Sequence, residues 1–190
     1  MSSRVIAGQA KGRRLKSVPG NSTRPIMDRV KEALFSIIGP DIIDAYVLDL
    51  FAGTGAVGIE ALSRGAEYVL FVERNRLAAS VIEENLEITR LQAGAEVRIA
   101  DAFELLKYPP ETPFDYIYIA PPQYKGIWRK TLEALDAQPD WIAPETTVIV
   151  QIDPKEQDPI TLTHLRAYDE RRYGNTLLWF FEATEDETHS

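Results

Sequence analysis

The chain has 190 residues, enough for one α/β domain with a full core and a short appendage. It contains no cysteine, which excludes disulfides and thiolate metal sites and suits a reducing cytosol. No apolar run reaches membrane-spanning length, and the first residues lack the apolar core of a signal peptide. We therefore expect a soluble, cytoplasmic protein.

The formal net charge of −8 is unevenly distributed. Residues 1–38 carry eight basic and two acidic side chains, a local charge of +6, whereas the rest carries 13 basic and 27 acidic ones, or −14. A basic segment on an acidic body is suited to a phosphate backbone, although a solvated charged surface would give the same pattern. The basic residues that we expect to contact nucleic acid are Arg4, Lys11, Arg13, Arg14, Lys16 and Arg24.

Hydrophobic periodicity predicts an alternation of helices and strands. Glycines bracket short apolar pieces within residues 1–22 and predict a small hairpin. Helical spacing predicts a helix over 28–38, stopped by Gly39-Pro40, and further helices that end at Arg64 and span 77–89 and 128–135. Strands are predicted at 46–51, 68–73, 97–100, 114–119 and 146–152, followed by a hairpin of 162–172 and 176–183. The pattern indicates a parallel sheet finished by an antiparallel hairpin.

Residues 47–62, VLDLFAGTGAVGIEAL, carry the main functional signal. An apolar strand runs into Gly53 and Gly55, which can take positive φ where backbone N–H groups approach a ligand. Gly58 allows the following helix to pack closely on the strand. The G-x-G-x-x-G spacing alone would equally fit a dinucleotide site or a tight turn without a ligand. Asp49, a carboxylate just before the turn, favours a cationic ligand.

Two more acids follow the next two strands. Glu73 closes the second strand, where an acid can accept both ribose hydroxyls of an adenosine ligand. Asp101 and Ala102 follow the third strand, where a carboxylate and a backbone N–H suit the edge of an adenine. Ligands of open parallel sheets bind at these strand ends. The series that begins with Asp49 therefore predicts a nucleoside-containing cofactor.

The fourth strand runs into Ala120-Pro121-Pro122-Gln123-Tyr124. The two prolines remove two N–H donors and stiffen the turn, which leaves carbonyl groups free to accept protons from an amino group. The aromatic ring that follows can stack on a base. This segment therefore predicts a site for an amino-bearing base.

Asp49-Leu50-Phe51-Ala52-Gly53-Thr54-Gly55 resembles motif I of class I methyltransferases that use S-adenosylmethionine (SAM). The longer string through Ser63-Arg64-Gly65-Ala66, with Arg4-Val5-Ile6-Ala7-Gly8, Lys11-Gly12-Arg13 and Thr23-Arg24-Pro25, resembles the RsmD-like enzymes. These methylate the exocyclic amino group (N2) of a guanine in bacterial small-subunit (16S) ribosomal RNA. The resemblance covers residues 4–183. It implies a Rossmann-like, mostly parallel sheet of seven strands whose last strand is antiparallel, and an N-terminal hairpin that faces the RNA.

The resemblance also implies roles for individual residues. The expected cofactor-binding residues are Asp49, Phe51, Ala52, Gly53, Gly55, Glu73, Arg74, Asp101, Ala102 and Thr23. The segment from Ala120 resembles motif IV of amino-directed methyltransferases, but Ala120 replaces an acid or amide and Gln123 precedes the aromatic. We expect Ala120, Pro121, Pro122, Gln123 and Tyr124 to be catalytic. The carbonyls of Ala120 and Pro121 would accept amino protons, Gln123 could replace the missing acceptor, and Tyr124 would stack on the target.

The predicted organisation is a basic arm at 1–22, a SAM-binding methyltransferase domain at 23–183 and an acidic tail at 184–190. The methyl donor is already activated, so no metal is expected. The expected partner is ribosomal RNA or a small-subunit assembly particle, bound by a monomer without membrane contact.

Three other functions stay open. A nicotinamide-dependent oxidoreductase would explain the glycines and Glu73, but not Asp49 or Pro121-Pro122. A DNA adenine methyltransferase would share the motifs but would need a separate target-recognition domain. A catalytically silent RNA-binding module is compatible with Ala120.

Overall fold

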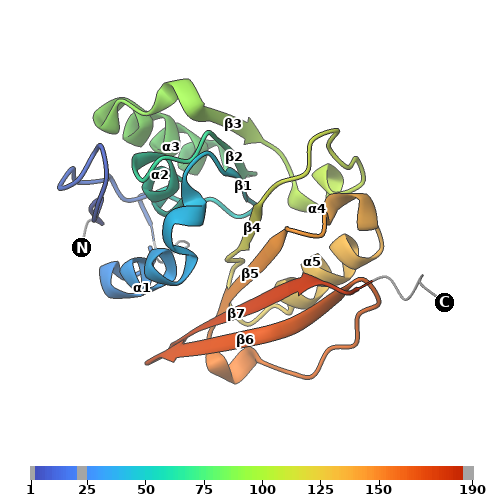
Figure 1. The fold of residues 1–190 in the computed structure, drawn as a ribbon. Coiled ribbons are helices and arrows are strands. Elements are labelled where there is room, and N and C mark those ends of the chain that lie inside the picture. The colour runs from blue at the N-terminus through green and yellow to red at the C-terminus, as the bar shows by residue number, and fades with distance from the viewer. Residues whose placement is uncertain (1–2, 21–24, 186–190) are drawn as a thin grey trace. The chain divides into compact units, whose positions relative to one another are not determined.

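The computed structural model of the chain describes residues 3–20 and 25–185 (Figure 1). They fall into two compact units, Met1–Ala102 and Phe103–Ser190, each with its own helices and strands. The predicted site residues Thr23 and Arg24 lie outside the described residues, as does most of the predicted acidic tail. The division into arm, methyltransferase domain and tail stays a prediction.

The first unit is built on three parallel strands, β1 (Tyr46–Asp49), β2 (Tyr68–Glu73) and β3 (Ala95–Ile99). β2 lies between the other two and pairs with both. α2 (Ala56–Ser63) packs on β1 and β2, and α3 (Arg76–Thr89) packs on β2 and β3. The middle residues of β2 are buried on both faces, as its continuous apolar run predicts. α1 (Asp28–Ile38) and the 3-10 turn η1 (Gly39–Ile42) precede β1, and η2 (Gln92–Gly94) precedes β3.

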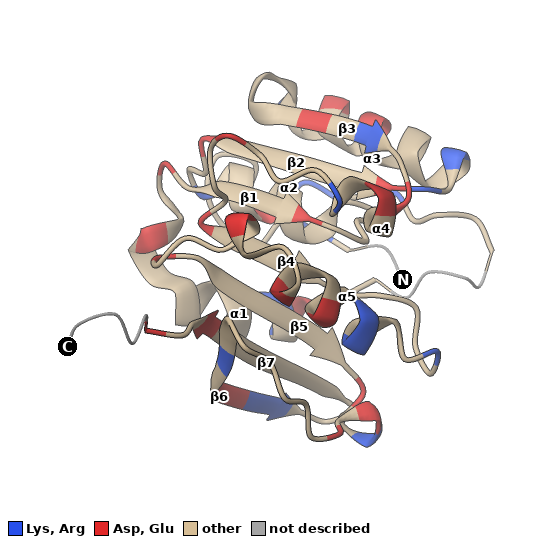
Figure 2. Cartoon of the chain, turned by 90° about the vertical axis from the view of Figure 1, so that its right-hand side faces the viewer, with Lys and Arg blue, Asp and Glu red and all other residues tan. Residues whose placement is uncertain are grey.

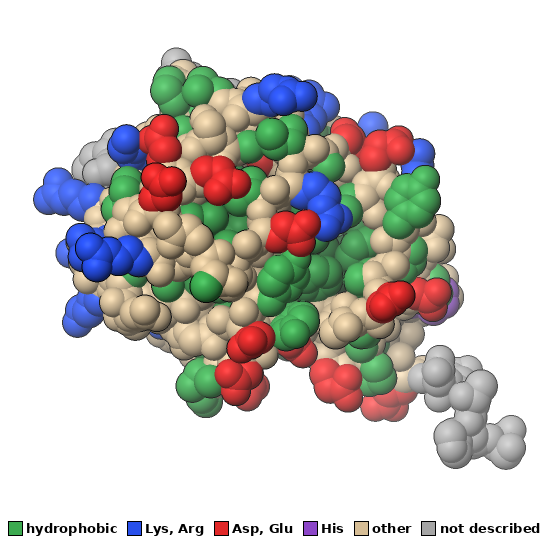
Figure 3. Space-filling view, turned by 90° about the horizontal axis from the view of Figure 1, so that it is seen from above, with side chains coloured by type: hydrophobic (Ala, Val, Ile, Leu, Met, Phe, Trp, Pro, Cys, Tyr) green, Lys and Arg blue, Asp and Glu red, His purple; other side chains and the backbone are tan. Residues whose placement is uncertain are grey.

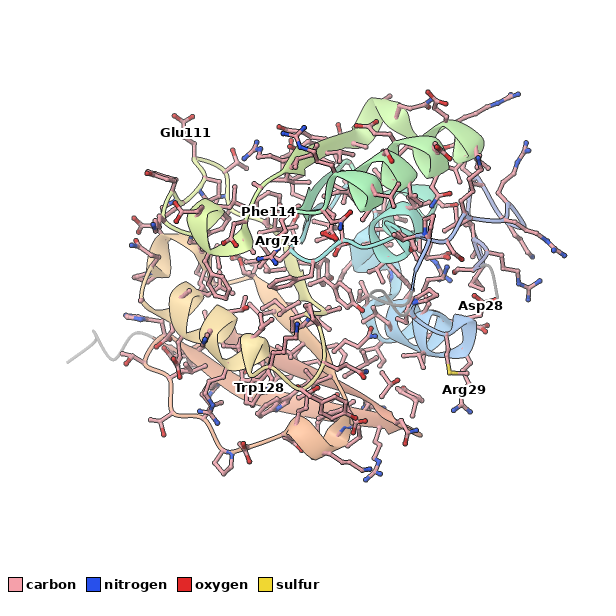
Figure 4. All side chains as sticks on the ribbon, turned by 180° about the vertical axis from the view of Figure 1, so that it is seen from behind. Asp28, Arg29, Arg74, Glu111, Phe114 and Trp128 are labelled. Atoms are coloured by element: carbon pink, nitrogen blue, oxygen red, sulfur yellow. The ribbon has the colours of Figure 1, made fainter. Side chains whose placement is uncertain are left out.

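The second unit contains the strands β4 (Tyr116–Ile119), β5 (Thr147–Ile152), β6 (Leu165–Tyr173) and β7 (Thr176–Ala183). β4 and β5 are parallel, and β7 runs antiparallel to both β5 and β6. α5 (Ile127–Asp136) packs on this sheet through Trp128, labelled in Figure 4, whose ring lies 5.5 Å from that of Trp179 in β7. The shorter elements are η3 (Pro139–Trp141) and η4 (Pro154–Glu156), together with α4 (Ala102–Leu105), which begins at the last residue of the first unit. Acidic and basic residues are interspersed along β6 (Figure 2), a pattern that discourages edge-to-edge association.

The predicted elements agree with the structure in most places. The helix over 28–38 and the strand over 68–73 have the predicted bounds. The terminal hairpin and the antiparallel last strand are confirmed. Gly58 packs as predicted, since a Cβ atom there would lie 2.3 Å from the ring of Phe71. The predicted N-terminal hairpin is reduced to one antiparallel bridge between Arg4 and Arg14 within residues 3–20. The four-residue α4 was too short to show periodicity.

One buried carboxylate attaches the N-terminal segment, residues 3–20, to the helices of the first unit. Glu60 of α2 and Lys31 of α1 have fully buried side chains and form an ion pair, with 3.3 Å between Oε1 and Nζ. The backbone N–H groups of Ile6 and Ala7 donate to the two oxygens of Glu60 at 2.9 and 3.1 Å. Arg64 donates to Oε2 at 2.9 Å. Burial lowers the pKa of Lys31, and the Glu60 carboxylate opposes that shift.

Ser63, at the end of α2, makes the second attachment. Its hydroxyl accepts from the N–H of Ala10 at 2.9 Å and donates to the carbonyl of Ala7 at 2.7 Å. Its own carbonyl accepts from the N–H of Gln9 at 2.8 Å. A Cβ atom at Gly8, whose φ is +83°, would lie 1.9 Å from that carbonyl oxygen. Only glycine therefore permits this approach of the segment to α2.

We expect Glu60→Gln to lower the free energy of unfolding by roughly 3 kcal/mol, because it leaves the buried Lys31 ammonium without a counter-charge. The matched control is Glu84→Gln, which removes an exposed carboxylate paired with Lys16 and should cost less than about 1 kcal/mol. Urea unfolding followed by circular dichroism measures both. Equal, small effects of the two substitutions would show that the buried pair does not stabilise the fold.

Candidate active site

The glycine turn connects β1 to α2. The N–H of Ala52 donates to the carbonyl of Val72 in β2 at 3.1 Å, and the N–H of Gly55 donates to the carbonyl of Ala52 at 2.8 Å. Gly53 and Gly55 have φ values of +57° and +81°, in the left-handed region. Gly55 is also the N-cap of α2. The turn thus has the backbone conformation that its glycines predict.

Asp49 ends β1 immediately before this turn and is 1% exposed. Neither of its carboxylate oxygens has a hydrogen-bond partner among the described residues. Burial raises the pKa of Asp49 to about 7, and the charge of Glu73 adds to the rise. The N–H of Gly58 acts in the opposite direction on this pKa, although its position does not satisfy the geometry of a hydrogen bond. A buried carboxylate without a partner is costly, so this site fits the cationic ligand that Asp49 predicts.

Glu73 and Asp101 follow β2 and β3. The backbone N–H groups of Arg74, Asn75 and Gly53 donate toward the Glu73 carboxylate. Burial raises the pKa of Glu73, and these donors oppose the rise. Asp101 lies 3.9 Å from the guanidinium of Arg74, which is 80% exposed and is labelled in Figure 4. The three predicted acids thus stand at or just beyond the carboxyl ends of the three parallel strands of the first unit.

The other predicted cofactor residues of the first unit lie in the same connections. Phe51 is half-buried, and Ala52 and Ala102 are buried. Ala102 also begins α4, directly after Asp101. The structure thus brings the predicted cofactor residues between 49 and 102 to the strand ends of one unit.

Asn85 of α3 was not predicted, yet it joins the glycine turn to the N-terminal segment. Its Nδ2 donates to the carbonyls of Thr54 at 3.0 Å and Lys16 at 3.1 Å. Its Oδ1 accepts from the N–H of Lys16 at 2.7 Å. Asn85 is fully buried, on the face of α3 that also carries Ile82 and Leu86. A polar residue on that apolar stripe was the signal available in the sequence.

The predicted catalytic segment follows β4 in the second unit. Ala120 is half-buried, Pro121 is buried, and Pro122 and Gln123 are exposed. The amide of Gln123 makes no hydrogen bond within the described part of the chain. Tyr124 is 64% exposed. The segment thus presents its polar groups and its aromatic ring on the surface of its unit.

Two acids that were not predicted hold Tyr124. Its N–H donates to Oε1 of Glu156 at 2.7 Å, and its hydroxyl donates to Oδ2 of Asp153 at 2.6 Å. Both acids come from the turn that follows β5. Asp153 directly follows β5, the fifth strand of the chain. It repeats the pattern of the acids at the ends of the first three strands, and this repetition could have identified it.

The basic residues of the N-terminal segment are exposed. Arg4 pairs with Asp28 at 3.3 Å and Lys16 pairs with Glu84 at 2.9 Å. The remaining ones, Lys11, Arg13 and Arg14, form no ion pair within residues 3–20 and 25–185. Basic side chains gather over this segment, at the left of the space-filling view (Figure 3). These three cations are thus available to an anionic partner.

Among the described residues, no group of three or more histidine or acidic side chains is arranged to hold a metal ion. In the same residues, no helix combines the length and apolar character needed to cross a membrane.

The fold and the glycine turn define a class I methyltransferase. A solved structure with this fold, the Escherichia coli protein yhhF, is 31% identical, covers 96% of this chain and 98% of its own, and has a TM-score of 0.84. The chain belongs to the family described as conserved hypothetical protein 95, whose model matches residues 3–182. Two relatives are named ribosomal RNA small subunit methyltransferase D. The Haemophilus influenzae protein is 33% identical over 90% of this chain and 89% of its own. The Escherichia coli K12 protein is 37% identical over 78% and 73%.

These findings confirm the predicted fold class and the resemblance to the RsmD-like enzymes. They do not bear on the roles of single residues, which stay predictions.

The pKa of Asp49 leads to a prediction about stability. The folded-state pKa, about 7, lies above the ordinary value of 3.8, so the folded protein binds this proton more tightly than the unfolded chain does. Ionisation of Asp49 therefore destabilises the ligand-free protein progressively as the pH rises from about 4 to about 7. Asp49→Asn should raise the free energy of unfolding at pH 8 by roughly 1–3 kcal/mol, since about 1.4 kcal/mol attaches to each pKa unit and the buried amide retains part of the desolvation cost.

Urea unfolding of the ligand-free protein at pH 4.5 and pH 8 measures this effect. The difference between wild type and Asp49→Asn should be much smaller at pH 4.5, where Asp49 is protonated in the folded protein and most of the pH-dependent loss has not yet occurred. Asp101→Asn, at a half-exposed carboxylate, is the matched control and should change little at either pH. A difference for Asp49→Asn that is independent of pH would contradict the raised pKa.

Proposed function

We propose that the chain transfers a methyl group from SAM to the exocyclic amino group (N2) of a guanine in small-subunit (16S) ribosomal RNA. Family membership and the names of two relatives of similar length support the reaction class and the substrate class. The single observation that carries the cofactor assignment is Asp49, a buried carboxylate with no hydrogen-bond partner in the described structure, placed directly before a glycine turn.

The residues of the first unit fit the parts of SAM. Asp49 and the backbone of Ala52–Gly55 would hold the cationic methionine end, because an ionised carboxylate complements its ammonium group. Glu73 would accept from the ribose hydroxyls, and Asp101 and Ala102 would bind the adenine edge. When bound, SAM supplies a methyl group that is already activated on a sulfonium sulfur. The chain's own contribution is therefore positioning, which can lower a barrier by ~7–11 kcal/mol.

The residues of the second unit fit the acceptor. The carbonyls of Ala120 and Pro121 would accept protons of the amino group and orient its lone pair, and the ring of Tyr124 would stack on the guanine. Gln123 has an amide that is free within the described residues to act as a further acceptor. The target has to be unpaired or extruded before it reaches such a site. No general base is needed before transfer, because the product ammonium loses its proton readily.

The exposed cations of the N-terminal segment would contact the RNA backbone. Arg14 forms the bridge with Arg4, and the carbonyl of Arg13 accepts the N–H of Val5 at 2.9 Å, so their backbone positions are defined. We further propose that the protein acts in the cytoplasm as a monomer, on free small-subunit RNA or on an assembly particle. The direct test of the function is mass spectrometry of ribosomal RNA nucleosides from a strain that lacks the protein. Loss of one N2-methylguanosine is the expected result, and an unchanged nucleoside profile would favour a silent RNA-binding module.

SAM should bind to the purified protein, and Glu73→Ala should weaken binding at least tenfold. The substitution removes two charge-assisted hydrogen bonds to the ribose, each worth about 1.5–3 kcal/mol. Isothermal titration calorimetry measures the affinity, with Glu67→Ala as the control, because Glu67 is exposed and precedes β2. Binding of NADH without binding of SAM would overturn the cofactor assignment, and SAM binding insensitive to Glu73 would overturn only the role of Glu73.

Replacing Lys11, Arg13 and Arg14 by alanine should weaken RNA binding and flatten its salt dependence. Each lost phosphate contact removes about 0.7–0.9 from the slope of log affinity against log salt. The matched control is Lys107, Arg166 and Arg171 to alanine, which makes the same change of net charge at side chains already paired with acids. Filter binding to small-subunit RNA at several salt concentrations, with SAM affinity measured alongside, provides the comparison. Equal loss in both triple variants would show that net charge, and not the N-terminal segment, determines RNA affinity.

A further inference from the structure

Tyr124 has an unusual backbone conformation. Its φ is +61°, in the left-handed region that residues with a Cβ atom rarely adopt. Its side chain is nevertheless 64% exposed, so the conformation does not serve to bury the ring in a core. Strain of this kind persists only where surrounding contacts enforce it. In Tyr124 such contacts are made by both the main chain and the side chain.

Both contacts come from one short turn after β5. Glu156 accepts the N–H of Tyr124 at 2.7 Å, and Asp153 accepts its hydroxyl at 2.6 Å. The first bond restrains the backbone and the second restrains the far end of the ring. Together they define the plane of an exposed aromatic ring that would otherwise rotate.

The turn that holds Tyr124 is itself well braced. Asp153 is 8% exposed and caps η4, since its Oδ1 accepts the N–H of Lys155 at 2.9 Å. The N–H of Glu156 donates to the carbonyl of Asp153 at 2.9 Å. The hydrogen bond from Tyr124, followed by that from Lys155, lowers the pKa of Asp153, so its carboxylate is ionised at neutral pH. The second oxygen of Glu156 is buried without a partner in the described residues, which makes this acid costly to retain for packing alone.

The position of Tyr124 in the sequence explains why its backbone conformation has to be held by these contacts. Gln123 separates the aromatic residue from Pro122, so the ring stands one residue later than a ring that follows the prolines directly. A one-residue displacement changes the direction of a side chain unless the backbone turns to compensate. The left-handed conformation provides such a turn, and the two acids keep it in place.

We propose that Asp153 and Glu156 are positioning residues that act through Tyr124, setting the plane on which the target guanine stacks. The inference rests on the proposed function, because it requires a base to be methylated. Substitution of either acid is expected to leave SAM binding in the first unit unchanged.

Single-turnover methylation of small-subunit RNA, with saturating SAM, tests this inference. Asp153→Ala and Glu156→Ala should each lower the rate constant at saturating RNA by between about 5- and 150-fold, the range that corresponds to loss of one base–aromatic stack. Asp153→Asn and Glu156→Gln keep an acceptor oxygen in place and should recover most of that loss. Asp158→Ala is the matched control, since it removes an exposed acid two residues beyond Glu156.

A double-mutant cycle separates positioning from general stability. Tyr124→Phe removes only the hydroxyl, so adding Asp153→Ala to it should cause little further loss in rate. The urea midpoint and SAM affinity of each variant show whether it is folded. If wild type methylates but folded Asp153→Ala and Glu156→Ala are as fast, or if the losses in the cycle are additive, the positioning role is wrong while the proposed function stands. If wild type methylates neither free RNA nor assembled particles, the proposed function fails and this inference fails with it.

Discussion

The burial of Glu60 is the constraint on which the first unit depends. A carboxylate removed from water is tolerated only when donors surround it, and here two of the donors are backbone N–H groups of residues 6 and 7. Because these donors belong to the main chain, Glu60 sets the register of the N-terminal segment as well as attaching it. The close approach at Gly8 reinforces that register. The exposed cations therefore extend from a backbone with a defined path, although it forms almost no regular β-structure.

Glu60 and Asp49 are both buried acids of the same unit, yet their surroundings are opposite. Glu60 is satisfied by a lysine, an arginine and two amides, whereas the oxygens of Asp49 have no partner among the described residues. The fold can thus satisfy a buried carboxylate where it serves structure, and the unsatisfied Asp49 is the one that we propose a ligand completes. Asn85 connects the N-terminal segment, which Glu60 holds, to the glycine turn that follows Asp49. Its side-chain amide contacts both Lys16 and Thr54.

Local patterns predicted most of the fold and much of the candidate site. The apolar run of β2, the stripe of α1 and the glycines after Asp49 act over a few residues, so periodicity and turn chemistry identify them. The missed features depend on contacts between distant parts of the chain. Glu60 meets residues more than 50 positions earlier, and Tyr124 meets acids about 30 positions later. No spacing rule connects such partners. The N-terminal hairpin is limited to one bridge and a few backbone hydrogen bonds between residues 3–5 and 12–15, and side chains of α1, α2 and α3 also hold that segment.

The unsatisfied Asp49 also has a consequence for the lifetime of the protein. A ligand that binds only the folded state stabilises it by RT ln(1 + [L]/Kd). For a cationic ligand here, part of the binding free energy would come from relieving the repulsion and desolvation of a carboxylate whose pKa is raised to about 7. The ligand-free form is thus the one that opens most often and exposes its chain to proteases. Because cellular degradation follows the population of opened molecules when opening is fast, the abundance of this protein would rise and fall with the supply of its cofactor.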